Sequence, residues 1–170
     1  WNVEKVGAPA LWEEGIRGEG VTVGIIDTGV DVDHPALKSK YRGTGEDGKL
    51  NNAYNFFDAV SGEKKPYDDN HHGTHVAGTV RGSTEDGVSG MAPDAKWIAA
   101  KILDEEGSGS ISDIVRALEW MIAPRDAKGK NPDPTKAPDI ISNSWGIGDP
   151  GYNGFRNVWS ALQESGITVV

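Results

Sequence analysis

The chain has 170 residues, with 17 basic and 26 acidic side chains and a formal net charge of −9. This acidic balance argues against nucleic acid or an anionic membrane as the main partner. There is no cysteine, which excludes disulfide bonds and a thiolate nucleophile, and no apolar run approaches the roughly 20 residues of a membrane-spanning helix. The length suits one domain with a hydrophobic core.

Four short apolar runs predict buried β-strands. The first, GVTVGIID at residues 20–27, is rich in β-branched side chains and ends at Asp27. Residues 96–103, 138–145 and 166–170 have the same character. Because each run lacks the polar alternation of a half-exposed strand, we expect a sheet that is covered on both faces.

Two segments between these runs have the periodicity of amphipathic helices. Within residues 111–122 the apolar side chains recur every 3.6 residues, and Ser110 or Ser112 can cap the start. Residues 155–162 show a second helical pattern, which Gly166 closes. The alternation predicts an α/β fold with a parallel, doubly wound sheet.

Asp27 lies where such sheets carry their chemistry, beyond the carboxyl end of a strand. An acid at a strand end is also a common turn former, so its position alone decides nothing. The stretch HHGTHVAGT at residues 71–79 supplies a partner, because its small residues predict a helix that packs closely on the sheet and begins at His72. The helix dipole there disfavours a protonated ring, which suits a general base held by a buried carboxylate.

The neighbouring histidines have weaker claims. We expect His71 to be exposed and His75 to face the packed interior, with a structural hydrogen bond. A zinc site at His71 and His75 is disfavoured, because no glutamate lies between them in the metalloprotease pattern and no third ligand is evident. A dinucleotide-binding domain fails as well, because GEGVTVG at residues 18–24 precedes a strand, whereas a dinucleotide loop must follow one.

Two motifs together point to a family. IIDTGVDVDHPAL at residues 25–37 and HGTHVAGT at residues 72–79 resemble the subtilisin-like serine proteases, the subtilases, in which the aspartate motif precedes the histidine motif. The similarity runs along nearly the whole chain. It implies that Asp27 is the catalytic aspartate and His72 the catalytic histidine of an Asp-His-Ser triad.

The resemblance also implies two substrate-binding segments that hold an extended polypeptide as an added strand. The matching residues are Gly107, Ser108 and Gly109 on one side, and Ser144, Trp145 and Gly146 on the other. Composition alone would equally allow a flexible loop and a plain strand end. Asp104, Glu105 and Glu106 precede the first segment and would favour basic substrate residues if they line the cleft rim; the alternative is an exposed acidic turn.

The nucleophile motif of the family, GTSMA, does not occur in residues 1–170. We therefore interpret residues 1–170 as the N-terminal portion of one subtilisin-like peptidase domain, truncated before the part that bears the serine and inactive alone. The remainder is expected as a partner, possibly on a separate nicked chain. A noncatalytic peptide-binding module or inactive fragment is the alternative to a serine endopeptidase.

The chemistry of such a triad needs no cofactor, but the resemblance makes structural calcium a candidate. The best-known calcium site of the family uses an aspartate directly after HP, where this chain has Ala36. The acidic residues Asp31, Asp33, Asp68 and Asp69 could hold a calcium ion at a different site, and they could equally form a solvated acidic face. The resemblance further implies a secreted, extracellular protein.

Overall fold

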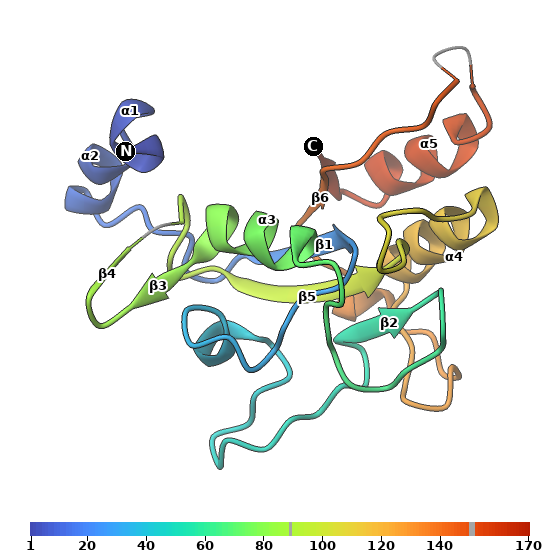
Figure 1. Ribbon diagram of the computed structural model, residues 1–170, viewed down its shortest axis with the longest axis horizontal. Coiled ribbons are helices and arrows are strands. Elements are labelled where there is room, and N and C mark those ends of the chain that lie inside the picture. Colours follow the sequence, from blue (N-terminus) through green and yellow to red (C-terminus); the bar gives the residue numbers. More distant parts are fainter. Residues whose placement is uncertain (89, 150–151) are drawn as a thin grey trace.

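The computed structural model describes residues 1–88, 90–149 and 152–170 and contains a five-stranded parallel sheet (Figure 1). The strands lie in the order β2-β5-β1-β6-β7, so the first long strand is central. They are β1 (Thr22–Asp27), β2 (Phe56–Asp58), β5 (Lys96–Lys101), β6 (Ile140–Asn143) and β7 (Thr168–Val169). All four pairings are parallel, as the alternation of strands and helices predicts.

The sheet is covered on both faces, and successive residues of its central strands belong to different cores. Val23 and Ile25 pack in the core beneath α3 (His72–Arg81), whereas Ile26 joins the core beneath α4 (Ile111–Ile122) and α5 (Arg156–Glu164). Two buried faces explain why these strands read as continuous apolar runs. The predicted doubly wound α/β architecture is confirmed.

Helix α4 begins as its sequence predicts. Ser110 is the N-cap, and its Oγ accepts a hydrogen bond of 3.1 Å from the backbone N–H of Asp113. The far end of α5 likewise matches, because Gly166, which follows the C-cap residue Ser165, has φ of +80°, a left-handed conformation that suits glycine. Both helices therefore start or stop where a local signal marks the boundary.

Several short elements have no clear periodic signal and were not predicted. They are α1 (Asn2–Lys5), α2 (Ala8–Glu13), β2, the hairpin of β3 (Ser83–Thr84) and β4 (Gly87–Val88), and the 3₁₀ turns η1 (Lys38–Lys40) and η2 (Pro134–Lys136). Elements of two to six residues are too short for a period to show. None of the helices in the described part of the chain combines the length and apolar character that a membrane crossing requires.

Candidate active site

Asp27 ends β1 and is fully buried. Its Oδ1 accepts a hydrogen bond of 2.7 Å from the backbone N–H of Thr28 and lies 2.7 Å from Nδ1 of His72. The contact that the sequence predicts between these two side chains is present. The second oxygen, Oδ2, is buried and accepts no hydrogen bond from another described residue, so the contacts of this carboxylate are made by Oδ1.

His72 is the first residue of α3, and its ring is half exposed, whereas the carboxylate of Asp27 is fully buried. Its backbone is fixed by Gly73, whose N–H donates to Oγ1 of Thr28 at 2.9 Å. A β-carbon at position 73 would lie 2.0 Å from the carbonyl oxygen of Gly29. Only glycine permits this approach, which seats the start of the helix on the turn after β1 and brings the imidazole to Asp27.

Asp68 holds the same helix start from the other side. Its Oδ2 accepts from the backbone N–H and the hydroxyl of Thr74, at 2.8 and 2.6 Å, and its Oδ1 accepts from Oγ1 of Thr28 at 2.8 Å and from the N–H of His71 at 2.9 Å. Burial opposes ionisation of this carboxyl, but the hydrogen bonds outweigh it and hold the pKa of Asp68 below its ordinary value. An ionised carboxylate there also complements the helix dipole.

The two predicted substrate segments face each other across adjoining cavities. One cavity, of about 270 Å³, is lined by His72 together with residues of both segments, including Gly107 and Ser144. The other, of about 490 Å³, is lined by Gly107, Ser108 and Gly109 and by Trp145 and Gly146. The structure thus brings all six predicted substrate residues to one cleft, and His72 lies at its wall.

The prediction that His75 faces the packed interior is wrong, because this residue is exposed. The buried residues of α3 are Gly73, Ala77 and Arg81, which are spaced by four. His75 lies two residues from Gly73, which places it about 200° around the helix, on the solvent side. Gly78 is also not a packing residue, since nothing lies within 4 Å of the position a β-carbon would take. His71 is exposed, as predicted.

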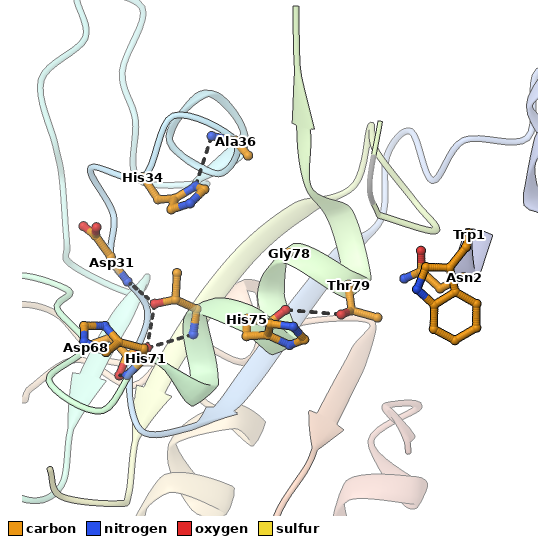
Figure 2. A pocket seen from close by; sticks show the side chains of 11 residues that line it. Trp1, Asn2, Asp31, His34, Ala36, Asp68, His71, His75, Gly78 and Thr79 are labelled. Atoms are coloured by element: carbon orange, nitrogen blue, oxygen red, sulfur yellow. Dashed lines mark hydrogen bonds between the residues drawn. The ribbon is translucent and has the colours of Figure 1, made fainter. Parts of the chain in front are cut away.

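A separate cavity lies along α3 (Figure 2). It measures about 680 Å³, and His34, His71 and His75 line it. Figure 2 shows these rings spread along the wall rather than turned to one point. In the part of the chain that the structure describes, no three His, Asp or Glu side chains are grouped to hold a metal ion.

Ala36, the position that matches the family calcium site, contacts a buried guanidinium group. The carbonyl oxygen of Ala36 accepts hydrogen bonds from Nη1 of Arg81 and from the backbone N–H of Ser83, and Nη2 of Arg81 donates to the carbonyl of Pro93 at 2.5 Å. The guanidinium is fully buried. A fixed cation on this carbonyl repels a divalent cation, so the residues present do not fit calcium there.

The acidic residues considered for another calcium site have other partners. Asp33 pairs with Lys38 and Lys65, at 3.3 and 2.6 Å, and these two ammonium groups lower the pKa of its carboxyl. Asp69 pairs with Lys101 at 2.6 Å. Calcium at a different position stays a prediction.

Two residues that organise the site were not identified from the sequence. For Asp68 the acidic pattern predicts a calcium ligand or a solvated acid, although an acid shortly before a helix is also a capping signal. Lys101 lies within the apolar run KWIAAKIL, which predicts only a buried strand. A lysine within an otherwise apolar buried strand is itself a signal, because a buried ammonium needs acceptors for its protons.

Comparisons with known proteins place these features in a family. Residues 18–170 match the family model described as the subtilase family. The chain is 50% identical over 168 residues to bacillopeptidase F of Bacillus subtilis, a match covering 95% of this chain and 12% of that protein. It is 40% identical over 122 residues to the intracellular serine protease of Paenibacillus polymyxa, covering 71% of this chain and 34% of that protein.

Subtilisin E of Bacillus subtilis is 34% identical over 171 residues, a match covering 99% of this chain and 38% of subtilisin E. The chain therefore spans well under half the length of each of these relatives. The family model, in contrast, covers most of the chain. On this evidence the chain belongs to the subtilase family, the family of subtilisin-like serine proteases.

Proposed function

We propose that the protein containing this chain is a serine endopeptidase that hydrolyses extended polypeptides with an Asp-His-Ser triad. The observation that carries the proposal is the contact of 2.7 Å between Nδ1 of His72 and Oδ1 of Asp27 at the wall of a cleft. The serine is expected beyond residue 170. Because the chain spans only part of its relatives, this activity is proposed for the whole protein.

The geometry suits the division of labour in such a triad. The buried carboxylate of Asp27 would accept the Nδ1 proton of His72, which orients the ring and leaves Nε2 as the basic nitrogen. Nε2 has no hydrogen-bond partner among the described residues, and the ring lines the cleft. His72 would take the proton of the serine hydroxyl as the hydroxyl attacks the peptide carbonyl, and then give it to the leaving amine.

The substrate would bind as a strand between the two segments at 107–109 and 144–146. Support comes from the backbone of Trp145 and Gly146, which lie beyond the end of β6 and make no backbone hydrogen bond to another described residue. Both segments line the cleft and are rich in glycine and serine, which leave the backbone accessible. An extended main chain could pair with such groups irrespective of its side chains.

Four further features complete the proposal. The partner beyond the substrate is the rest of the peptidase domain, in the same chain or as a nicked second chain, which would extend the sheet past β7. No nucleic-acid or membrane partner is proposed for this acidic chain. The chemistry needs no cofactor, and a structural calcium would lie away from Ala36. An extracellular location is proposed from the family, although one relative is named an intracellular protease.

The test compares two histidines of one helix in the full-length protein. His72→Ala should lower peptide turnover by about 10⁴-fold or more while peptide binding is retained, because the general base is lost. His75→Ala is the matched control, since His75 is exposed on the same helix and should leave turnover unchanged. Residues 1–170 alone should bind peptide weakly and not hydrolyse it.

The alternative is a noncatalytic peptide-binding module. It predicts that the full-length protein binds extended peptides but releases them intact, with no covalent adduct from a serine-directed phosphonofluoridate. Unchanged turnover in His72→Ala would remove His72 from the mechanism. Peptidase activity of residues 1–170 that His72→Ala abolishes would mean that the nucleophile lies within this segment.

A further inference from the structure

Lys101 is a lysine with a fully buried side chain, placed directly beside the candidate catalytic aspartate. It ends β5, and its Cα is paired with that of Asp27 in the parallel ladder of β1 and β5. Paired residues of neighbouring strands project to the same face of a sheet, so both side chains point to the face that α3 covers. The proposed mechanism assigns Lys101 no role.

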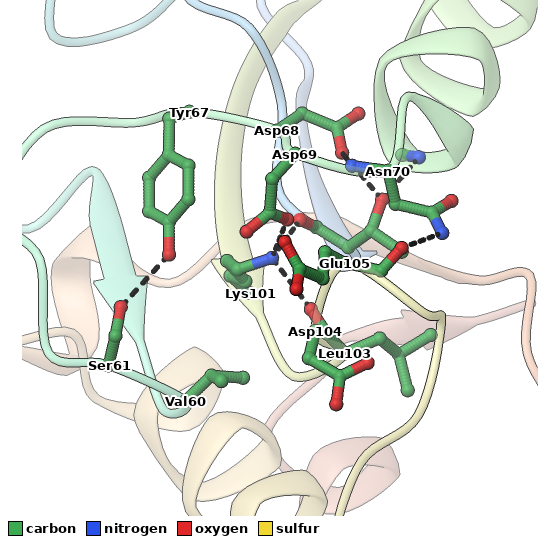
Figure 3. A network of polar contacts seen from close by, with 12 residues as sticks. Val60, Ser61, Tyr67, Asp68, Asp69, Asn70, Lys101, Leu103, Asp104 and Glu105 are labelled. Atoms are coloured by element: carbon green, nitrogen blue, oxygen red, sulfur yellow. Dashed lines mark hydrogen bonds and ion pairs between the residues drawn. The ribbon is translucent and has the colours of Figure 1, made fainter.

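All three protons of the Lys101 ammonium are used (Figure 3). Nζ donates to the carbonyl oxygen of Thr28 at 2.7 Å, to the carbonyl oxygen of Leu103 at 2.7 Å and to Oδ1 of Asp69 at 2.6 Å. The ring of Tyr67 lies 5.0 Å from Nζ. An ammonium has three donors and no acceptor, so these contacts satisfy it completely.

The three acceptors belong to three different parts of the site. Thr28 directly follows Asp27, Asp69 lies in the loop that leads to His72, and Leu103 begins the loop that leads to the substrate segment at 107–109. Asn70 adds a second link between the last two, because its side-chain N–H donates to the carbonyl of Glu105 at 2.8 Å (Figure 3). One ammonium therefore joins the acid, the base and one wall of the cleft.

Stability does not by itself call for a lysine here, because the cost of taking an ammonium out of water offsets much of what its contacts contribute. A methionine of similar length would fill the same space, but it would leave three oxygen atoms without a donor. What methionine cannot do is hold three oxygen atoms from separate segments at one point. Fixed relative placement of reacting groups is what turnover depends on, and an error of about 1 Å can cost about 10²-fold in rate.

We propose that Lys101 is a positioning residue, whose ammonium fixes the turn after Asp27, the loop before His72 and the substrate segment relative to one another. This inference rests on the proposed peptidase function. It assigns Lys101 no contact with the substrate. It predicts that removing the ammonium lowers the rate of each correctly folded site, rather than only the number of folded sites.

The experiment uses full-length Lys101→Met and the matched control Lys65→Met, which removes a lysine whose side chain is 60% exposed and lies outside this network. Active sites are counted by titration with a phosphonofluoridate, and kcat is expressed per titrated site. Lys101→Met should lose about 10²-fold in kcat per site, with most sites still titratable. Lys65→Met should match the wild type.

Two variants of Asp69 keep the inference testable if Lys101→Met does not fold, since the Asp69 side chain is 36% exposed. Asp69→Asn keeps an oxygen acceptor for the ammonium and should stay within about threefold of wild-type kcat, whereas Asp69→Ala removes it and should lose about tenfold. Equal kcat per site in Asp69→Ala and the wild type would overturn the inference. So would a Lys101→Met protein with fewer titratable sites but full activity per site.

A measurement without turnover separates this inference from the proposed function. Proton NMR of the protein labelled at histidine should give a strongly deshielded Nδ1 proton for His72 in the wild type and in Lys65→Met, and a weaker or missing signal in Lys101→Met. If His72→Ala fails to reduce turnover, the proposed function is wrong, but this signal still reports whether Lys101 holds His72 against Asp27. An unchanged signal and unchanged kcat in Lys101→Met would reject the positioning role alone.

Discussion

Two glycines of α3 offer a matched test of how closely this helix must approach β1. A β-carbon at Gly73 would lie 2.0 Å from the carbonyl oxygen of Gly29 and 3.1 Å from Cβ of Asp27, whereas one at Gly78 would meet nothing within 4 Å. The same substitution to alanine should therefore have opposite effects at the two positions, although both lie in one helix.

The magnitudes follow from these distances. An ordinary carbon–oxygen contact needs about 3.3 Å, so Gly73→Ala must move the helix start by more than about 1 Å. Overpacking of this kind costs about 1–3 kcal/mol, and the displacement should lower turnover by about 10²-fold because His72 moves away from Asp27. Gly78→Ala should instead stabilise the protein by about 0.5–1 kcal/mol, since alanine restricts the unfolded chain, and leave turnover intact.

Both quantities can be measured in the full-length protein. Denaturant unfolding in a His72→Ala background, where self-digestion is not expected, gives the difference in free energy of unfolding, and peptide hydrolysis with His72 present gives kcat. If Gly73→Ala proves as stable and as active as Gly78→Ala, the helix start is not seated on the Gly29 carbonyl and the account of how His72 is placed is wrong.

Three more outcomes are expected. Asp68→Asn should have a lower free energy of unfolding than the wild type. Because the pKa of Asp68 is lowered in the folded state, this difference should be complete above about pH 3.9, the pKa in the unfolded state, and should fade as the pH falls through the lower folded pKa. A difference that stays constant in urea titrations across this pH range would contradict the assignment. Ser110→Ala should cost about 1 kcal/mol of unfolding free energy by loss of the α4 cap, and no change would show that the cap is dispensable. Replacing the exposed Glu105 and Glu106 together by glutamine should remove a preference of the enzyme for basic residues upstream of the cut. Equal cleavage of matched lysine and glutamate peptides by the wild type at low salt would contradict this prediction.

Asp104 is left out of the prediction on substrate charge because its carboxylate has a structural role. Its Oδ1 accepts hydrogen bonds from the backbone N–H of Glu106, at 3.1 Å, and of Ser108, at 2.8 Å. The carboxylate thus closes the turn before the substrate segment, as acids in turns commonly do. Its replacement would disturb the segment itself and could not report on the charge of the cleft rim.

The parts of the fold that sequence predicts well are those with a local physical signature. The run ending at Asp27 is buried on both faces, and its composition shows it. The start of α4 carries a serine cap and a 3.6-residue stripe, and the end of α5 carries a glycine. Strand β2 has only three residues and no such signature, so its place at the edge of the sheet depends on pairing with β5.

The rotation of α3 about its own axis is a feature that the hydrophobic pattern of the sequence does not predict. Its inward face is defined by the absence of side chains at Gly73 and by the small Ala77, so there is no apolar stripe that fixes the phase of the helix. Three histidines in five positions then give no indication of which one turns to the sheet. The answer comes from the close contact of Gly73 with Gly29, which is not local in sequence.

The same reason applies to the polar contacts that hold the site together. Lys101 and Thr28 are 73 positions apart, Lys101 and Asp69 are 32 apart, and Gly73 and Thr28 are 45 apart. A periodicity over ten or fifteen residues cannot predict such distant pairs, whereas strand and helix boundaries can be predicted from residues within that window. A motif can therefore name Asp27 and His72, but the distance between them depends on residues that the motif does not contain. Where a charged residue interrupts a buried apolar run, as Lys101 does, its acceptors are the first contacts to seek, because the energetic cost of burying the charge requires that they exist.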